Sequence, residues 1–523
     1  MLAVLLSATL HGIAGRTVRV EVDVAPGLPG FTIVGLPDAA LSEARERVRG
    51  ALRNAGFQHP PRRITVNLAP AELRKAGASL DLAIAIGILL GSEQLRANTG
   101  GVGMIGELGL GGEVRSVPGI LPMCLALGAR GIRQVLVPTE GLSEARLAPG
   151  VQPLPVGTLA EAADILRLPR TRRAPREPLP RAGGPNLPDT DPPATAPRPV
   201  ADPPVDLADV RGQAVARRAL EIALAGGHAM LLVGPPVSGK TLLARTIPTL
   251  LPDLDDEAAL AATVVASVAG SGTVTGLVRR PPVRMPHHTT SYAGMVGGGP
   301  RMSPGEVTLS DQGVLFCDEL PEFGRDVLEA LRQPLEDGSV SVVRVGRAET
   351  FPARFTFIAA MNPCPCGQFG ASDRTCSCPQ GVPGRYLRRV SGPLRDRIDL
   401  WVNVDRVPPA ALVSGVEPEG SAEVASRIAV ARDRQRSRNG DMANGRLRGR
   451  GLRAACGLDR DALARAIRLA ELEGLSGRGT ERLLRVARTI ADLEGSDVVS
   501  MPHLDEAARF RAPVDRMALG RTA

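Results

Sequence analysis

The sequence predicts an α/β fold whose central part is a parallel sheet with crossover helices. Three observations predict it. Between residues 206 and 407, short apolar runs typical of buried strands alternate with helical segments. One run, residues 229–233, leads directly into a loop with glycine at both ends and then into a helix. Another run, residues 313–317, ends in two acidic residues. Strands that alternate with helices in this way form parallel sheets.

The loop after residues 229–233 fits the pattern G-x-x-x-x-G-K-[ST], which cradles nucleotide phosphates. Its backbone N–H groups and the following helix N-terminus favour negative charge. Lys240 would reach the β- and γ-phosphates, and the Thr241 hydroxyl would bind Mg²⁺. Val237 stands where many such loops carry glycine. The predicted nucleotide-binding residues are Gly234, Pro235, Pro236, Val237, Ser238, Gly239, Lys240 and Thr241.

Length and composition are those of a large globular protein. A chain of 523 residues is expected to form about two to four domains. Because aromatic residues make up only 2% of the chain, base stacking is excluded as a dominant binding mode. The net charge of +8 permits a polyanionic partner, but arginine-rich composition is also the ordinary result of a GC-rich genome.

Nothing in the sequence predicts export or a membrane. No apolar stretch approaches the ~18 residues that span a bilayer. The apolar start, residues 1–6, runs into an alternating strand pattern at residues 17–24 and lacks the basic region of a signal peptide. The seven cysteines do not resemble a disulfide framework. We therefore expect a cytoplasmic protein.

Four segments are expected along the chain. Residues 1–167 mix alternating strands with helices and predict an α+β domain. Residues 168–205 are rich in Pro and Arg and predict a linker. Residues 206–407 form the α/β core, with a cysteine-rich insertion at 364–378, and residues 408–523 are helical and basic.

Residues after later strands are expected to complete the nucleotide site. Asp318 follows the run 313–317 and would hold Mg²⁺ through water, while Glu319 would polarise the attacking water. Asn362 ends the apolar run 355–361 and is placed to position the same water. An ordinary turn asparagine is the alternative interpretation of Asn362.

Two arginines are candidates for charge stabilisation. Arg397 lies in the segment 391–400, from which an arginine can reach the γ-phosphate held by a neighbouring subunit. Arg478 opens a later helix and is interpreted as contacting phosphate in its own chain. Arg395 and Arg482 are alternatives for these two roles, and a solvated surface charge is an alternative for each.

The order of these motifs resembles an AAA+ ATPase core with a helical lid. The segments 27–38, 285–289, 296–299, 304–306, 320–323 and 361–367 resemble the magnesium-chelatase-like YifB/ComM family. The resemblance implies a hexameric, ATP-driven DNA helicase that promotes branch migration during natural transformation. Cys317 departs from the usual leucine of the family. The resemblance carries the catalytic roles over to Lys240, Thr241, Asp318, Glu319, Asn362, Arg397 and Arg478.

Residues 339–351 predict a hairpin with basic residues around its turn. In a ring, Arg344 and Arg347 would contact the DNA backbone with little dependence on sequence. A solvated hairpin is the alternative. His287 and His288 lie on the other candidate pore loop, where hydrogen bonding is favoured over a metal site.

Four cysteines in the insertion form the pattern C-x-C-x9-C-x-C. Four thiolates on a short loop can close a tetrahedral Zn²⁺ site without catalytic function. Reduced loop thiols are the alternative, because C-x-C is tighter than the usual C-x2-C spacing. The candidate ligands are Cys364, Cys366, Cys376 and Cys378.

Residues 1–167 resemble the proteolytic domain of Lon, a ribosomal S5 domain 2-like fold. Ser79 stands where the nucleophile would be. A serine nucleophile needs a base, which is a lysine in Lon, and that position here is Met123. Methionine cannot take a proton, so we predict a structural or assembly role without peptidase activity. Lys75 is the one nearby alternative base.

The resemblance thus implies an enzyme that hydrolyses ATP with Mg²⁺, binds single-stranded or branched DNA, forms a homo-hexamer and does not engage a membrane. Two other functions stay open. One is a chelatase-type motor that acts on a porphyrin–metal insertion partner, against which the Lon-like domain and the cysteine cluster argue. The other is an ATP-dependent Lon-like protease, which Met123 disfavours.

Overall fold

The chain forms two compact units, one made of Met1–Pro192 with Thr263–Val278 and the other of Pro193–Ala262 with Arg279–Ala523. The computed structural model describes residues 1–36, 39–73, 75, 77–173, 205–270, 272, 274–299, 302–344, 347–370, 374–407 and 418–511, without the side chains of residues 39, 40, 42, 344 and 347. Most of the predicted linker, residues 174–204, therefore lies outside the described residues.

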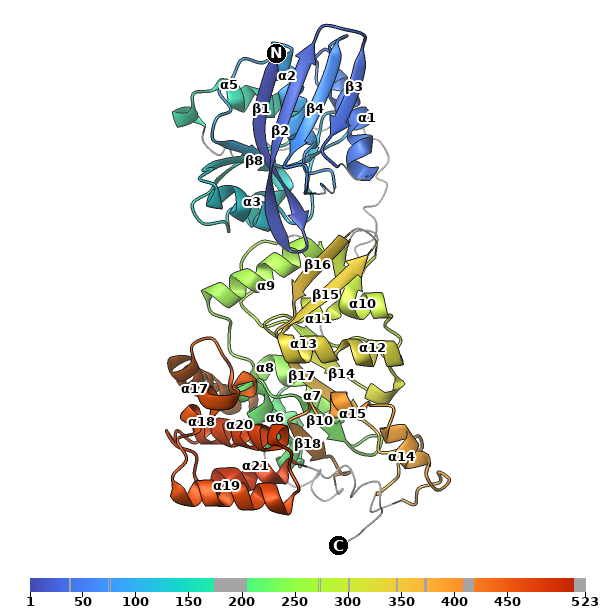
Figure 1. Cartoon of the computed structure of the whole chain (residues 1–523), viewed down its shortest axis with the longest axis vertical. Helices are drawn as coiled ribbons and strands as arrows, with labels where there is room; N and C mark the ends of the chain where they lie inside the picture. Colours follow the sequence, from blue (N-terminus) through green and yellow to red (C-terminus); the bar gives the residue numbers. More distant parts are fainter. Residues whose placement is uncertain are drawn as a thin grey trace. The chain divides into compact units, whose positions relative to one another are not determined.

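The first unit is built on a seven-stranded mixed sheet in the order β3-β4-β2-β1-β5-β8-β9 (Figure 1). The apolar start and the alternating segment after it form an antiparallel pair, β1 and β2. Val18, Val20, Val22 and Val24 are buried, as the two-residue period predicts. The strands are β1 (Leu2–His11), β2 (Ala14–Ala25), β3 (Gly30–Val34), β4 (Arg63–Ala69), β5 (Val102–Met104), β8 (Gln134–Pro138) and β9 (Gln152–Val156), with a small pair β6 (Glu107–Leu108) and β7 (Val114–Arg115).

Helices of the first unit pack on this sheet. One of them, α2 (Asp81–Gly91), is apolar and almost entirely buried. It approaches β2 closely, because a Cβ added to Gly87 would lie 2.4 Å from Cγ2 of Val22. The other helices are α1 (Ala39–Asn54), α3 (Ile120–Ala129), α4 (Leu142–Ala145) and α5 (Leu159–Arg167).

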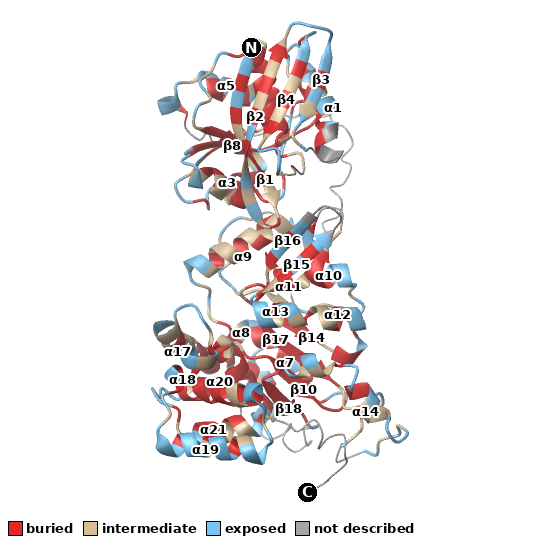
Figure 2. Cartoon of the chain, viewed as in Figure 1, coloured by how far each residue is buried: buried red, intermediate tan, exposed pale blue. Residues whose placement is uncertain are grey.

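The second unit contains a five-stranded, fully parallel sheet in the order β11-β14-β17-β10-β18. The strands are β11 (Val283–Arg284), β14 (Val314–Cys317), β17 (Thr356–Met361), β10 (Met230–Val233) and β18 (Leu400–Asn403). Their central members are buried along their whole length (Figure 2), which explains the continuous apolar runs in the sequence. The predicted α/β class with a parallel sheet is confirmed.

Helices surround this sheet and continue into the carboxyl-terminal segment. Within the described ranges, no helix is both long and apolar enough to cross a membrane. The helices are α6 (Ala214–Gly226), α7 (Lys240–Arg245), α8 (Ile247–Leu250), α9 (Asp256–Ala269, of which the residues from Thr263 onward belong to the first unit), α10 (Tyr292–Val296), α11 (Glu306–Leu309), α12 (Arg325–Ala330), α13 (Arg332–Asp337), α14 (Val382–Leu387), α15 (Gly392–Arg395), α17 (Ser421–Asn439), α18 (Gly449–Cys456), α19 (Arg460–Leu472), α20 (Gly477–Leu493) and α21 (Met501–Arg509). Two short antiparallel pairs complete the unit: β12 (Gly297–Gly298) with β13 (Ser303–Pro304), and β15 (Ser339–Arg344) with β16 (Arg347–Pro352).

Candidate nucleotide site and the opposite edge of the sheet

The predicted phosphate loop lies between the carboxyl end of β10 and the start of α7. Gly234 begins it in a tight passage, because a Cβ there would lie 2.0 Å from the carbonyl oxygen of Val404. Gly239 has φ +89°, and a Cβ there would meet nothing within 4 Å, so the backbone stays open to a ligand on this side. Val237 is 96% exposed with φ 63°. A β-branched residue is strained in that region, which accounts for the glycine common at this position.

Lys240 is the buried cation of the loop. Its ammonium donates to the carbonyl oxygens of Gly234 and Pro235, at 2.8 Å each. It also lies 3.4 Å from Oδ1 of Asn362, the residue that follows β17. Burial lowers the pKa of Lys240 to about 8, against the opposing attraction of Asp318 and Glu319. The structure thus brings together the loop lysine and the strand-tip asparagine predicted from the sequence.

Thr241 and Asp318 meet where a magnesium ion is predicted. The Thr241 hydroxyl donates to Oδ2 of Asp318 at 2.7 Å, and Oδ1 of Asp318 accepts from the N–H of Glu319 at 2.9 Å. A hydroxyl and a carboxylate are the oxygen ligands that Mg²⁺ prefers. Together with the open backbone at Gly239 and the ammonium of Lys240, this donor set fits a nucleoside triphosphate bound with Mg²⁺.

Glu319 has a neighbour that sequence reasoning missed. Nδ1 of His288 lies 3.5 Å from Oε2 of Glu319, and the ring of His287 stacks 4.1 Å from that of His288. Glu319 itself has φ 52°, an uncommon backbone conformation for a residue other than glycine. A signal was present: residues 285–289 follow β11, which pairs in parallel with β14, so the ends of both strands reach the same edge.

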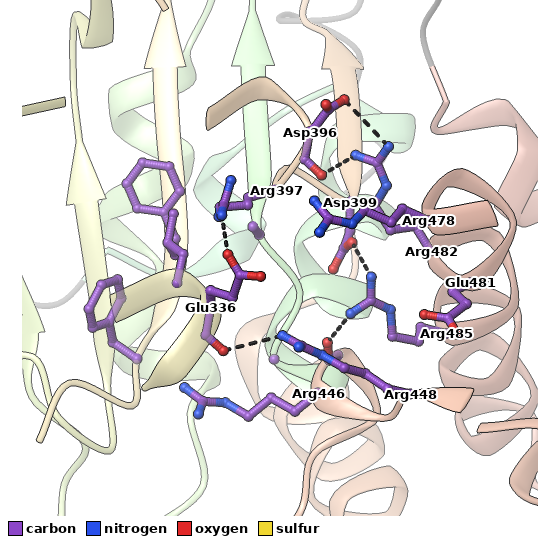
Figure 3. A pocket seen from close by; sticks show the side chains of 16 residues that line it. Glu336, Asp396, Arg397, Asp399, Arg446, Arg448, Arg478, Glu481, Arg482 and Arg485 are labelled. Atoms are coloured by element: carbon purple, nitrogen blue, oxygen red, sulfur yellow. Dashed lines mark hydrogen bonds and ion pairs between the residues drawn. The ribbon is translucent and has the colours of Figure 1, made fainter. Parts of the chain in front are cut away.

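Arg397 and Arg478 lie together in a different pocket (Figure 3). That pocket is lined by Ala229, Phe355 and Asp399, which directly precede β10, β17 and β18. It therefore lies at the amino edge of the parallel sheet. The phosphate loop, which is described in full and contributes no lining residue, follows the carboxyl end of β10. At about 3.3 Å per residue, a four-residue strand separates the two edges by roughly 13 Å.

The sequence predicts that Arg478 contacts phosphate in its own chain, and this contact stays a prediction. In this structure Arg478 lines the pocket at the sheet edge opposite its own phosphate loop. Of the alternatives left open, Arg482 is buried and donates to the carbonyl oxygens of Asp396 and Ile398, whereas Arg478 is exposed. Arg482 thus holds the segment before β18, and Arg478 is the arginine available to an outside ligand.

Glu336 positions Arg397 within the pocket. It accepts a hydrogen bond from Nη2 of Arg397, and Nη1 donates to the carbonyl oxygen of Pro393 at 2.7 Å. The hydrogen bond from Arg397, followed by its charge, holds the pKa of Glu336 below its usual range. Glu336 therefore stays ionised and keeps the guanidinium oriented.

Comparison with known proteins identifies the family. Three family models match: magnesium chelatase, subunit ChlI, at residues 206–412; subunit ChlI of Mg-chelatase at 20–141; and magnesium chelatase, subunit ChlI C-terminal, at 418–511. The chain is 42% identical over 511 residues to the uncharacterized protein YifB of Escherichia coli K12, covering 97% of this chain and 96% of the relative. It is 40% identical over 521 residues to the competence protein ComM of Haemophilus influenzae, covering 98% of each.

The chain belongs to the magnesium-chelatase-like YifB/ComM family. A further relative is the uncharacterized protein Rv2897c of Mycobacterium tuberculosis, 40% identical over 513 residues and 96% covered on each side. Membership of this family, with the geometry above, indicates an AAA+-type ATPase that uses ATP and Mg²⁺.

The hairpin predicted at residues 339–351 is present as β15 and β16. Arg344 and Arg347 face each other in its register, at the two sides of the turn. Their side chains lie outside the described residues, so their contact with DNA stays a prediction. His287 forms a hydrogen bond with Thr289 at 2.8 Å, in agreement with the hydrogen-bonding interpretation.

In the first unit, Ser79 and Lys75, which were compared with the catalytic dyad of Lon, both form hydrogen bonds with the main chain. The Ser79 hydroxyl donates to the carbonyl oxygen of Ala8 at 2.9 Å, and the Lys75 ammonium donates to that of Pro70. Ser79, Lys75 and Met123 are all buried. That the first unit lacks peptidase activity stays a prediction.

Proposed function

We propose that this chain is an ATP-driven DNA motor of the AAA+ type, assembled as a ring of six copies, that promotes branch migration while DNA is integrated in natural transformation or recombination. The proposal rests on one observation: the nucleotide site and the pocket of Arg397 and Arg478 lie at opposite ends of the strands of the parallel sheet. A nucleotide bound by one chain receives neither arginine from that chain. A head-to-tail contact with a second copy supplies them, and such contacts close into rings.

In this arrangement each predicted residue has one task. Lys240 binds the phosphates, and Thr241 with Asp318 holds Mg²⁺, which supplies charge neutralisation at the phosphate oxygens. Glu319 polarises the attacking water, with Asn362 beside Lys240 to position it. Arg397 of the adjoining copy stabilises the charge that develops in the transition state.

DNA is supported as the substrate by the name of the Haemophilus relative, a competence protein, and by the net charge of +8. Two of the carboxyl-terminal arginines are held by contacts within the chain. Arg432 donates to the carbonyl oxygen of Leu224, and Arg438 forms an ion pair with buried Asp492 at 2.8 Å. We therefore assign DNA contact to the β15–β16 hairpin, with Arg344 and Arg347 at its turn.

We further propose that α17–α21 form the helical lid and that the first unit is a Lon-like domain without peptidase activity. Two rival functions remain testable. A chelatase-type motor is favoured by the match to the magnesium chelatase family, and its partner would be a porphyrin-binding subunit. A Lon-like protease would require a freed Ser79 and a base.

The test compares stimulation of ATP hydrolysis by branched DNA with stimulation by a porphyrin-binding chelatase subunit. We expect stimulation by branched DNA, together with displacement of its strands, and loss of both in Lys240→Ala and Glu319→Gln. Arg460→Ala, an exposed arginine on α19 outside the pocket, is the matched control. Stimulation by the porphyrin-binding subunit alone would replace the proposal with the chelatase alternative. ATP-dependent cleavage of casein that Ser79→Ala abolishes would favour the protease.

A further inference from the structure

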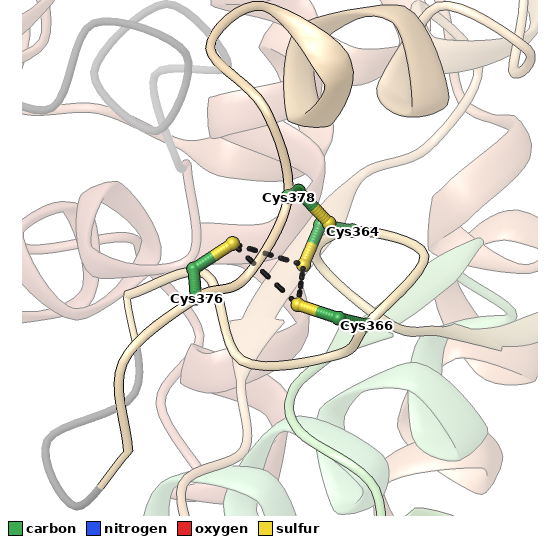
Figure 4. A group of neighbouring side chains, drawn as sticks. All are labelled: Cys364, Cys366, Cys376 and Cys378. Atoms are coloured by element: carbon green, nitrogen blue, oxygen red, sulfur yellow. Dashed lines mark hydrogen bonds between the residues drawn. The ribbon is translucent and has the colours of Figure 1, made fainter.

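The loop after β17 gathers four cysteines at one point (Figure 4). It leaves the sheet at Asn362 and returns to the fold at α14. The Sγ atom of Cys364 lies 3.3 Å from that of Cys366 and 3.8 Å from that of Cys376, and Cys366 and Cys376 are 3.5 Å apart. With Cys378, all four Sγ atoms lie within 4.8 Å of one another.

These separations suit one metal ion. In a tetrahedral thiolate site with Zn–S bonds of about 2.3 Å, the sulfur atoms lie roughly 3.8 Å apart. Soft thiolates select zinc over the hard Mg²⁺ of the nucleotide site. Four cysteine ligands leave no open position, so the ion would be structural. On binding, the four thiols release their protons to solvent.

The same loop touches the phosphate loop. The N–H of Gly367 donates to the carbonyl oxygen of Cys364 at 2.9 Å, which closes a tight turn around the first two cysteines. A Cβ added to Gly367 would lie 2.4 Å from Cδ of Pro236, in the middle of the phosphate loop. Asn362, two residues before Cys364, lies beside the Lys240 ammonium. The cysteine loop therefore contacts the phosphate loop at two points.

We propose that Cys364, Cys366, Cys376 and Cys378 bind one structural zinc ion, which braces the phosphate loop through Gly367 and Asn362. Fixing the four sulfur atoms on one ion fixes the turn that abuts Pro236. The bracing role rests on the proposed ATPase function, whereas the metal site itself does not. Metal content and nucleotide affinity are therefore measured separately.

The metal site is tested by metal analysis of the purified full chain. We expect about one zinc per chain and loss of most of it in Cys366→Ser. Cys456→Ser, a cysteine buried in α18 and remote in sequence from the cluster, is the matched control and should retain the zinc. Loss of zinc in Cys366→Ser could also result from misfolding. The zinc of the wild-type chain is therefore also replaced by Co²⁺, whose visible spectrum reports tetrahedral thiolate ligation. A chain that purifies with iron, or without metal and without a cobalt–thiolate spectrum, overturns the site.

The bracing role is tested with a glycine pair in the same loop. Gly367 and Gly370 have φ of +76° and +75°, but only Gly367 lies against Pro236, and nothing lies within 4 Å of a Cβ on Gly370. Gly367→Ala should keep its zinc and weaken binding of a fluorescent ATP analogue roughly tenfold, while Gly370→Ala should not. Equal affinities in the two variants overturn the bracing role. A wild-type chain that holds zinc but binds no nucleotide would refute the ATPase proposal and leave the metal site intact.

Discussion

The separation of the two sheet edges makes a specific prediction about mixtures of inactive chains. Lys240→Ala chains keep Arg397 but cannot bind the phosphates, and Arg397→Ala chains keep the phosphate loop but cannot complete a neighbour's site. Each variant alone should lose ATP hydrolysis by about a thousandfold or more. If the arginine acts between copies, an equal mixture regains activity, because some interfaces join an intact phosphate loop to an intact arginine.

The size of the recovery follows from the geometry of a head-to-tail ring. An interface is productive only when an Arg397→Ala chain holds the nucleotide and a Lys240→Ala chain supplies the arginine. Random exchange makes about a quarter of the interfaces productive, whatever the number of subunits. Loss of folding would not explain inactivity of Arg397→Ala. Its partner Glu336 is 37% exposed, so after solvent screening the ion pair contributes at most about 1 kcal/mol to stability.

The assay measures phosphate release from each variant and from mixtures at increasing ratios, with light scattering to confirm assembly. In a matched control, Arg460→Ala replaces Arg397→Ala. The rate of phosphate release from this mixture should fall in proportion to its content of Lys240→Ala chains. Mixtures that assemble into rings yet stay as inactive as their components would refute the placement of Arg397 in a neighbouring site. So would an Arg397→Ala chain with full activity.

Three further outcomes follow from the nucleotide site. Glu319→Gln should bind ATP with unchanged affinity and hydrolyse it at least about a hundredfold more slowly; turnover that survives would place the polarising group elsewhere. His288→Ala should lower kcat by roughly tenfold with KM unchanged, because it removes the side chain that orients Glu319. His287→Ala should lower kcat less, and equal losses in the two variants would contradict this role of His288. Burial lowers the pKa of Lys240 to about 8, and only its charged form attracts phosphate, so affinity for an ATP analogue should be full at lower pH and fall as pH rises through 8. Calorimetry in two buffers of different ionisation enthalpy should then detect proton uptake on binding just above that pH, and its absence would contradict the assignment.

The sequence was sufficient wherever a feature depends on residues close together in the chain. The run at residues 229–233 became β10, and residues 339–351 became the β15–β16 hairpin, because strand period and turn position are local properties. The order of the first unit's sheet was not predictable in this way. Its strand β1 lies between β2 and β5, a pairing that joins residues far apart in the sequence.

The same distinction holds for the candidate site: some of its residues were predictable from the sequence and others were not. Lys240, Asp318 and Asn362 were predictable because each follows an apolar strand, and parallel strands end at one edge. The position of Arg478 was not predictable, because it depends on how α20 packs beside the segment before β18, where Arg482 donates to the carbonyl oxygens of Asp396 and Ile398. No spacing in the sequence specifies that contact.

Strand β17 connects the two edges of the sheet. Phe355 and Phe357, at its amino end, line the pocket that holds Arg397 and Arg478. Asn362, directly after its carboxyl end, lies beside Lys240. The strand is buried along its whole length and paired on both sides, by β14 and β10, so it resists bending. In a ring that uses both edges, β17, like β10 beside it, is a direct covalent path between the arginines a chain offers to one neighbour's nucleotide and the nucleotide it holds itself.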